Sequence, residues 1–160
     1  TADRIDIAGL GHAGLNGSAT AAADPKNPLG LVKPSKLADW GDMVRSLVNV
    51  AGEKERDLPR VQVDMDVYRA VARGFLSTAR RVTPAEVGLM ADAPQIIALE
   101  LGLRFLLDYL RGDSYFKLGP ADPPDLNGAR AMAQLSLFQR LRERADEARQ
   151  FIADLHAEFA

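Results

Sequence analysis

The residues from Leu99 to Lys117 carry the clearest arrangement for chemistry in this chain. They begin as an apolar run that predicts a helix built for burial, and only Glu100, Arg104 and Asp108 interrupt it. Their spacing of four residues places the three ionisable side chains on one side of that helix. A short polar and aromatic segment, Asp113–Lys117, follows directly. An arginine on a buried helix beside such a segment predicts a site that holds a polyol.

Two interpretations of this stripe are open. In one, Glu100, Arg104 and Asp108 form a solvated ladder of ion pairs, each worth about 0.2–0.5 kcal/mol. In the other, the two carboxylates aim Arg104 into a cleft and Tyr115 closes one wall of it. The second interpretation makes Arg104 and Tyr115 contact residues, with Glu100, Asp108 and Asp113 in support.

A second charged cluster lies at Asp39–Arg45, around the only tryptophan, Trp40. Asp42 and Arg45 are compatible with a capped helix start closed by an ion pair. They are also compatible with a polar corner that shapes a cleft near Arg104, with Trp40 in support.

Helix caps and apolar spacing predict the elements that position these groups. The first helix is expected to begin at Asp39 as its cap and to end at Gly52. Its expected apolar stripe is Met43, Leu47 and Val50.

Two further helix starts are predicted. Asp64 or Asp66 opens a helix whose inward side is expected to be Val67, Val71, Phe75 and Ala79. Thr83–Glu86 supplies a threonine cap, a proline at the first helical position and a glutamate at the third. That helix should be short, because Pro94 begins the next one.

The last helix is expected to run unbroken from about Leu126. Its apolar residues alternate steps of three and four: Phe138, Leu141, Ala145, Ala148, Ile152, Leu155 and Phe159. Such a narrow seam predicts packing on the chain's own body, with a dimer seam in the last turns as the alternative. Alternating strand patterns are scarce, so the predicted fold class is all-α.

Residues 1–36 are rich in Ala, Gly, Asn and Pro and predict an irregular arm, with at most one short strand at 4–8. Residues 37–160 are the predicted helical domain. Gly9–Gly14 matches the G-x-G-x-x-G pattern of dinucleotide-binding loops, but no second strand follows it, and a flexible glycine arm fits better.

Composition excludes several classes of function. The 160 residues are 47% hydrophobic and 26% charged, which is typical of one soluble globular domain. The net charge of -2 and the lack of a basic tract argue against nucleic-acid binding. There is no cysteine for disulfides or thiolate sites, and His12 and His156 are too far apart in sequence to suggest a metal site. No apolar run approaches the roughly 20 residues of a membrane span, and no secretion signal is visible, so we expect a cytoplasmic protein.

Two strings resemble a known family. D-W-G-D-M-V-R at 39–45 resembles the D-[FWY]-G-D-x-x-R block of small-molecule kinases of the aminoglycoside phosphotransferase superfamily. The string at 99–117 resembles the E-x-G-x-R-F-L-x-D-Y-L-x-G-D-x-Y-F block of its N-acetylhexosamine 1-kinase group. Further matches follow the family's order at 74–76, 83–86 and 125–131, so that the resemblance covers residues 33–138.

This resemblance implies the helical part of the C-terminal lobe, which walls the sugar pocket in such kinases. Arg104 and Tyr115 would then contact the sugar, and Asp42 and Arg45 would support the pocket floor. ATP and Mg²⁺ are implied only for a complete member of the family.

The family's parts that transfer phosphate have no match. Phosphoryl transfer needs a catalytic aspartate and a carboxylate-held metal. The H-G-D catalytic loop has no counterpart here, Gly30 stands where the metal-binding aspartate is expected, and the nucleotide-binding lobe is absent. No catalytic or metal residue is therefore assigned, and the chain is not expected to consume ATP alone.

The sequence thus predicts the sugar-binding helical subdomain of a hexosamine-kinase-like phosphotransferase, in a truncated or fragmentary form. Its expected partners are a sugar or amino sugar and a missing kinase lobe on another polypeptide. The alternative is a non-catalytic interaction module that forms a homodimer through the 138–159 seam.

Overall fold

The computed structural model describes residues 36–79 and 82–159 of the chain. These ranges hold α2 (Lys36–Val48), a 3₁₀ turn η2 (Leu58–Arg60), α3 (Met65–Thr78), α4 (Pro84–Leu89), α5 (Ala93–Leu110), α6 (Leu126–Glu143) and α7 (Ala145–Phe159). Within them there is no β-strand, only an isolated bridge between Asn49 and Val63, so the all-α prediction is confirmed. The predicted strand at 4–8, the glycine motif at Gly9–Gly14 and the arm before Lys36 lie outside the described residues.

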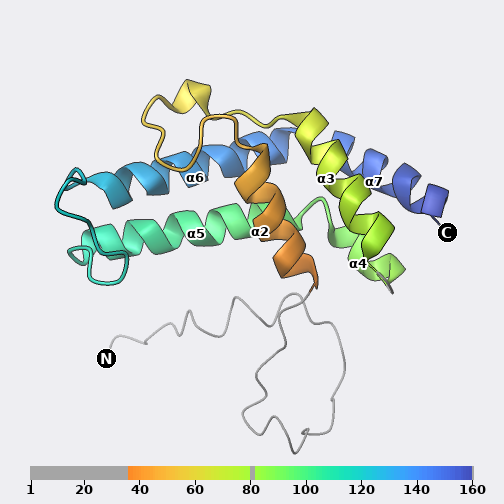
Figure 1. Ribbon diagram of the computed structural model, residues 1–160, viewed down its shortest axis with the longest axis horizontal. Coiled ribbons are helices and arrows are strands. Elements are labelled where there is room, and N and C mark those ends of the chain that lie inside the picture. Colours follow the sequence, from red (N-terminus) through yellow and green to blue (C-terminus); the bar gives the residue numbers. More distant parts are fainter. Residues whose placement is uncertain (1–35, 80–81, 160) are drawn as a thin grey trace, which may run out of the picture. The chain divides into compact units, whose positions relative to one another are not determined.

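The long antiparallel pair of α5 and α6 forms the centre of the helical body (Figure 1). Helix α2 packs across α5, while α3 and α4 pack on α7. The approach of α2 to α5 is close at Gly41. A Cβ atom there would lie 2.8 Å from Cγ1 of Ile97 and 2.9 Å from the carbonyl oxygen of Ala93.

Trp40 lies in the hydrophobic core and is fully buried. Its indole Nε1 donates to the carbonyl oxygen of Met90 at 2.7 Å. Its ring also meets Tyr68 edge-on and Phe75 at centroid distances of 5.8 and 5.2 Å. The structure therefore places this predicted supporting residue in the core, where it ties α2 to α3 and to the end of α4.

The predicted start of the first helix is wrong, and of its predicted stripe only Met43 packs against the core. The helix begins at Lys36, so Asp39 lies within its first turn and cannot cap it, and it ends at Val48, before Gly52. Leu47 and Val50 are 54% and 63% exposed. The buried face is instead Leu37, Trp40, Gly41, Val44 and Val48. The neighbouring helices select this face because it combines the one large ring with the glycine that allows close approach.

Two predicted helix starts are confirmed. The carboxylate of Asp64 accepts from the backbone N–H groups of Asp66 and Val67, at 2.9 and 3.1 Å, and so caps α3. Thr83 and Glu86 form the reciprocal capping box of α4. The inward face of α3 is rotated by one residue from the prediction, since Tyr68, Ala72 and Leu76 are its buried residues, while Val67, Val71 and Phe75 are partly buried against the core.

The expectation of one unbroken final helix is wrong. Arg144 separates α6 from α7, and its carbonyl oxygen accepts from the N–H of Ala148 at 2.9 Å to begin α7. The break lets α6 lie along α5 while α7 packs on α3 and α4. The predicted seam packs on the chain's own body, since Leu141, Ala145, Ala148, Ile152 and Leu155 are buried.

Helix α5 is not buried all round, contrary to the prediction. Its buried face runs from Ala93 to Asp108, whereas a row on the other side is exposed: Ile96, Leu103, Leu107 and Leu110. Among the described residues, α2 and α6 are the helices that pack along α5, and they cover only one side of it. No helix in the described ranges combines the length and apolar character needed to cross a membrane.

Candidate functional site

Asp108 organises the segment that follows α5. It is 6% exposed, and its two carboxylate oxygens accept from the backbone N–H groups of Tyr115 and Phe116 at 2.9 and 2.8 Å. The hydroxyl of Ser114 donates to it at 3.3 Å. Burial by itself raises the pKa of this carboxyl, but these hydrogen bonds outweigh that effect and hold its pKa below the usual value. Asp108 therefore remains charged and fixes the loop.

The three residues of the polar stripe lie in different environments. Glu100 and Arg104 are exposed, but Asp108 is buried. Four residues advance a helix by about 40° more than one full turn, so Asp108 has rotated toward the loop. All three residues are described, and no ion pair joins Arg104 to either carboxylate. The ladder interpretation is therefore wrong, and so is the expectation that the two carboxylates aim Arg104 into a cleft.

Arg104 lies over two aromatic rings of the loop. Its guanidinium carbon is 5.6 Å from the ring centroid of Tyr115 and 5.5 Å from that of Phe116. Tyr115 is 70% exposed. Within the described part of the chain, the guanidinium N–H groups of Arg104 have no hydrogen-bond acceptor. They are therefore open to a ligand beside an exposed aromatic ring.

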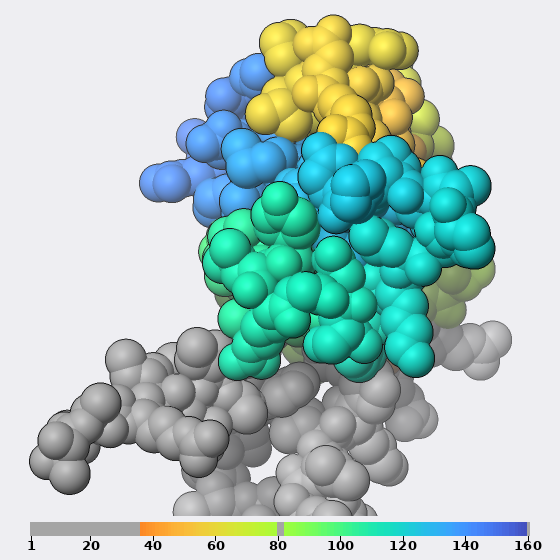
Figure 2. All heavy atoms as spheres, turned by 90° about the vertical axis from the view of Figure 1, so that its left-hand side faces the viewer, coloured from red at the N-terminus to blue at the C-terminus, as the bar shows by residue number. Residues whose placement is uncertain are grey.

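These groups line a hollow of about 420 Å³, which we call the loop hollow. Its lining is Arg104, Leu107, Asp108, Arg111, Ser114, Tyr115 and Phe116. It belongs to the end of the helical body where the end of α5, the 111–125 segment and the start of α6 gather (Figure 2). Of the sequence-predicted residues, the structure brings Arg104, Asp108 and Tyr115 together here.

The loop is also fastened from the side of α6. Asn127 is fully buried, and its amide donates to the carboxylate of Asp113 at 2.9 Å and to the carbonyl oxygen of Phe116 at 2.7 Å. Asp113 itself has a φ of 57°, in the left-handed region that an aspartate tolerates better than most residues. Asp113 therefore supports the loop without lining the hollow.

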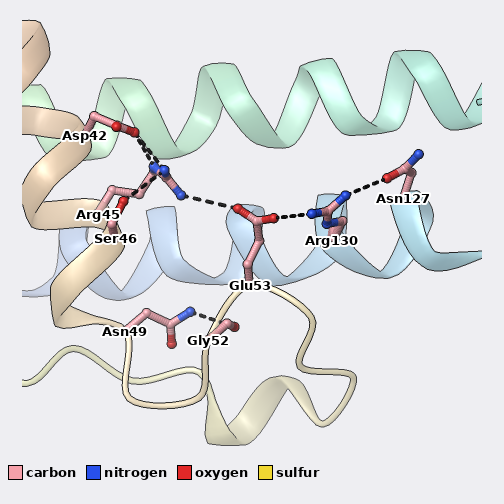
Figure 3. Close-up of polar contacts among 8 residues, drawn as sticks. All are labelled: Asp42, Arg45, Ser46, Asn49, Gly52, Glu53, Asn127 and Arg130. Atoms are coloured by element: carbon pink, nitrogen blue, oxygen red, sulfur yellow. Dashed lines mark hydrogen bonds and ion pairs between the residues drawn. The ribbon is translucent and has the colours of Figure 1, made fainter. Parts of the chain in front are cut away.

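A polar chain leads from Asn127 to α2, which we call the relay (Figure 3). Arg130 donates to Asn127 at 3.2 Å and pairs with Glu53 at 2.9 Å. The other oxygen of Glu53 lies 3.6 Å from Arg45, which pairs with Asp42 at 2.7 Å. Asp42 and Arg45 thus lie away from the loop hollow and reach it only through Glu53, Arg130 and Asn127.

Local sequence explains how Glu53 enters the relay. The chain turns after α2 with Gly52 at a φ of 79°, and the side-chain amide of Asn49 donates to the Gly52 carbonyl at 2.9 Å (Figure 3). This turn carries Glu53 back toward α6. The guanidinium of Arg130 also contacts an aromatic ring, with its carbon 4.8 Å from the ring centroid of Phe105.

Sequence reasoning missed Glu53, Asn127, Arg130 and Arg111. Asn127 and Arg130 fall within the D-L-N-G-A-R-A string that resembled the kinase family, which was a usable signal. Glu53 stands in a charged segment with no spacing that sets it apart. Its role depends on a contact across 77 positions of sequence with Arg130.

A second hollow of similar size lies between the 55–58 segment and the α5–α6 pair. Its apolar lining includes Leu58, Leu106 and Met132, and Arg56 pairs with Asp125 through two contacts of 2.8 Å at its edge. The charged groups at that edge satisfy one another. This hollow therefore offers fewer free donors than the loop hollow.

The groups that line the loop hollow are suited to binding a ligand. It presents an open guanidinium, an exposed aromatic ring and a carboxylate already occupied by backbone donors. In the described ranges no three histidines or carboxylates come together in a way that could hold a metal ion.

Compared with models of known protein families, the chain matches none. The kinase resemblance of the two strings remains a prediction from the sequence.

Proposed function

We propose that this chain is a sugar-binding helical subdomain, with the loop hollow as its site and a sugar or amino sugar as its ligand. Arg104 donates to ring hydroxyls, and Tyr115 lies against the face of the sugar ring. Binding is weak, since the site is open to solvent and makes few contacts.

The observation that carries this proposal is the open guanidinium of Arg104 over the exposed ring of Tyr115. Arginine donors in a fixed fork suit paired oxygen atoms, and an aromatic face suits the C–H face of a sugar. The surrounding loop is held by Asp108 and Asn127, so the ligand does not have to order it. Preorganisation of this kind lowers the cost of binding.

In this proposal Asp42 and Arg45 support the loop only indirectly, through the relay, and do not form the pocket floor that the sequence suggested. They steady Glu53 and Arg130, which in turn hold Asn127 against the loop. Any phosphoryl transfer requires a nucleotide-binding lobe in addition to this helical subdomain, and ATP and Mg²⁺ belong to that assembly. The cytoplasmic location predicted from the sequence is part of the same proposal.

Titration with N-acetylglucosamine or N-acetylgalactosamine tests the proposal. Amide resonances of Ser114, Tyr115 and Phe116 should shift at millimolar sugar, and Tyr115→Ala or Arg104→Gln should abolish the shifts. The matched control is Arg142→Gln, because Arg142 is exposed and takes no part in the hollow. No shift in the wild type at millimolar sugar would overturn the proposal, as would an unchanged response in both site variants.

The alternative function, a dimerisation module built on the 138–159 seam, has less support. Leu141, Ile152 and Leu155 are used inside the chain, and only Phe159 in the last turn of the seam is exposed, at 48%. Sedimentation velocity distinguishes the two functions. A dimer that dissociates with Phe159→Glu would favour the module over the sugar site.

A further inference from the structure

Arginines are paired throughout the described part of the chain, with few exceptions. Salt bridges join most of them to carboxylates: Arg45, Arg56, Arg60, Arg69, Arg73, Arg130, Arg140, Arg144 and Arg149. In the same ranges Arg104, Arg111 and Arg142 have no carboxylate partner. Arg104 and Arg111 line the loop hollow together. Two of the unpaired guanidinium groups are therefore concentrated at one place.

The spacing of these two arginines suits a ligand that lies between them. Arg104 lies on α5 and Arg111 is the C-cap residue directly after its last residue, Leu110. Seven positions separate the two arginines, which places them on the same side of the helix and roughly 10 Å apart along its axis. Leu107 lies between them and lines the floor of the hollow. Long arginine side chains can converge from both ends on a group held over this floor.

The one carboxylate in the lining does not neutralise the pair. Both oxygens of Asp108 accept hydrogen bonds from the loop, and neither lies in an ion pair with Arg104 or Arg111. Glu100 is one turn away on α5 and does not line the hollow. The charged groups in the lining are thus two guanidinium groups and one carboxylate, which leaves a net positive charge although the whole chain carries -2.

The geometry points to an anionic sugar as the ligand of the loop hollow, that is, a sugar carrying a carboxylate or a phosphate group. This inference rests on the proposed function and adds the substrate class. Arg104 and Arg111 hold the anionic group, and Tyr115 holds the sugar ring. A guanidinium binds a carboxylate or phosphate through hydrogen bonds between ions of opposite charge, so the attraction of the two charges adds to what the same donors gain with a neutral hydroxyl.

Titrations of the full chain with matched ligands test this inference. The ligands are N-acetylglucosamine as the neutral sugar, glucuronic acid as the carboxylate, glucose 6-phosphate as the phosphate, and inorganic phosphate alone. At low salt we expect one or both anionic sugars to bind about five- to tenfold more tightly than the neutral sugar. Added salt should reduce that advantage.

The variant Arg111→Gln removes one of the two positive charges and leaves Arg104 and Tyr115 in place, so it tests the contribution of that charge alone. This variant should lose most of the preference for the anionic sugar, so that its affinities for the anionic sugar and for N-acetylglucosamine become similar. Arg142→Gln removes an unpaired, exposed arginine elsewhere and should leave both ligands unaffected. An amide spectrum that keeps the wild-type dispersion shows that each variant is folded.

The outcomes distinguish this inference from the proposed function. Equal affinity for neutral and anionic sugars overturns the inference and leaves the sugar site standing. No response to any sugar overturns both. Inorganic phosphate that binds as tightly as glucose 6-phosphate, with no loss in Tyr115→Ala, also overturns the inference, because the hollow would then recognise the anion without the sugar.

Discussion

The side-chain amide of Asn127 donates to the main-chain carbonyl oxygen of Phe116 at 2.7 Å, from the first turn of α6 to the loop that carries Tyr115. The same amide donates to Asp113, while its oxygen accepts from Arg130. One buried side chain therefore joins the loop hollow to the relay that reaches α2.

Replacement of this amide should destabilise the fold and loosen the loop. Asn127→Ala leaves the Phe116 carbonyl without its donor, and we expect a loss of about 1–3 kcal/mol in the free energy of unfolding. Urea unfolding followed by circular dichroism measures it. The control is Gln150→Ala, whose exposed amide bonds to Asp154 and whose loss should change stability by less than about 0.5 kcal/mol. Equal stability of the two variants would contradict the anchoring role.

Acid should release the loop through Asp108. The pKa of its carboxyl is lowered in the folded chain from the usual 3.8, because hydrogen bonds from Tyr115 and Phe116 outweigh the effect of burial. The stability that this group supplies is therefore complete above about pH 4 and is lost as the pH falls through the lowered pKa. Amide shifts of Tyr115 and Phe116 followed on acidification measure this step.

Asp108→Asn supplies the control for the acid step. An amide cannot accept at both positions, so this variant should loosen the loop at neutral pH and remove the step at low pH. The exposed Asp39→Asn should retain it. A step that persists in Asp108→Asn would assign it to another group.

The contact between α2 and α5 predicts opposite signs for two glycine substitutions. A Cβ at Gly41 would meet Ile97 and the backbone of Ala93, so Gly41→Ala should destabilise the chain by about 1–3 kcal/mol. A Cβ at Gly74, inside α3, meets nothing within 4 Å, so Gly74→Ala should stabilise it by about 0.5–1 kcal/mol. Thermal unfolding of the two variants measures the contrast. Gly41→Ala as stable as the wild type would refute the close approach.

The tryptophan in the core predicts a further contrast. Trp40→Phe leaves the Met90 carbonyl without the indole donor in a buried setting, and should cost about 1–3 kcal/mol. Leu47→Ala should change stability by less than about 0.5 kcal/mol because Leu47 is 54% exposed. Urea unfolding followed by far-ultraviolet circular dichroism compares them. A large loss of stability in Leu47→Ala would instead support the apolar stripe that the sequence predicted as the buried face of this helix.

Local signals in the sequence were sufficient for part of the fold. Thr83 and Glu86 stand three positions apart and cap each other, and Asp64 caps the helix directly after it, so neither start depends on distant residues. The break between α6 and α7 at Arg144 could not be predicted from the local sequence, because neither glycine nor proline marks it. It depends on α6 and α7 packing against different helices.

Part of the candidate site was visible in the sequence for the same reason. Arg104 and Tyr115 lie eleven positions apart, joined by one helix end and one short loop, and their proximity follows from that local geometry. The relay could not be predicted this way. Glu53 and Arg130 come from segments that only the folded chain brings within 2.9 Å.

The sequence by itself determined the all-α class, the caps and the two residues that face each other across the end of α5, because these depend on interactions within one or two turns. The tertiary structure alone decided which face of α5 is buried and that Asp108 faces the loop instead of Arg104. It also decided that the guanidinium groups of Arg104 and Arg111 are free. Those outcomes depend on which side chains, distant in the sequence, become neighbours in the fold. The spacing of apolar residues along the chain does not predict these contacts.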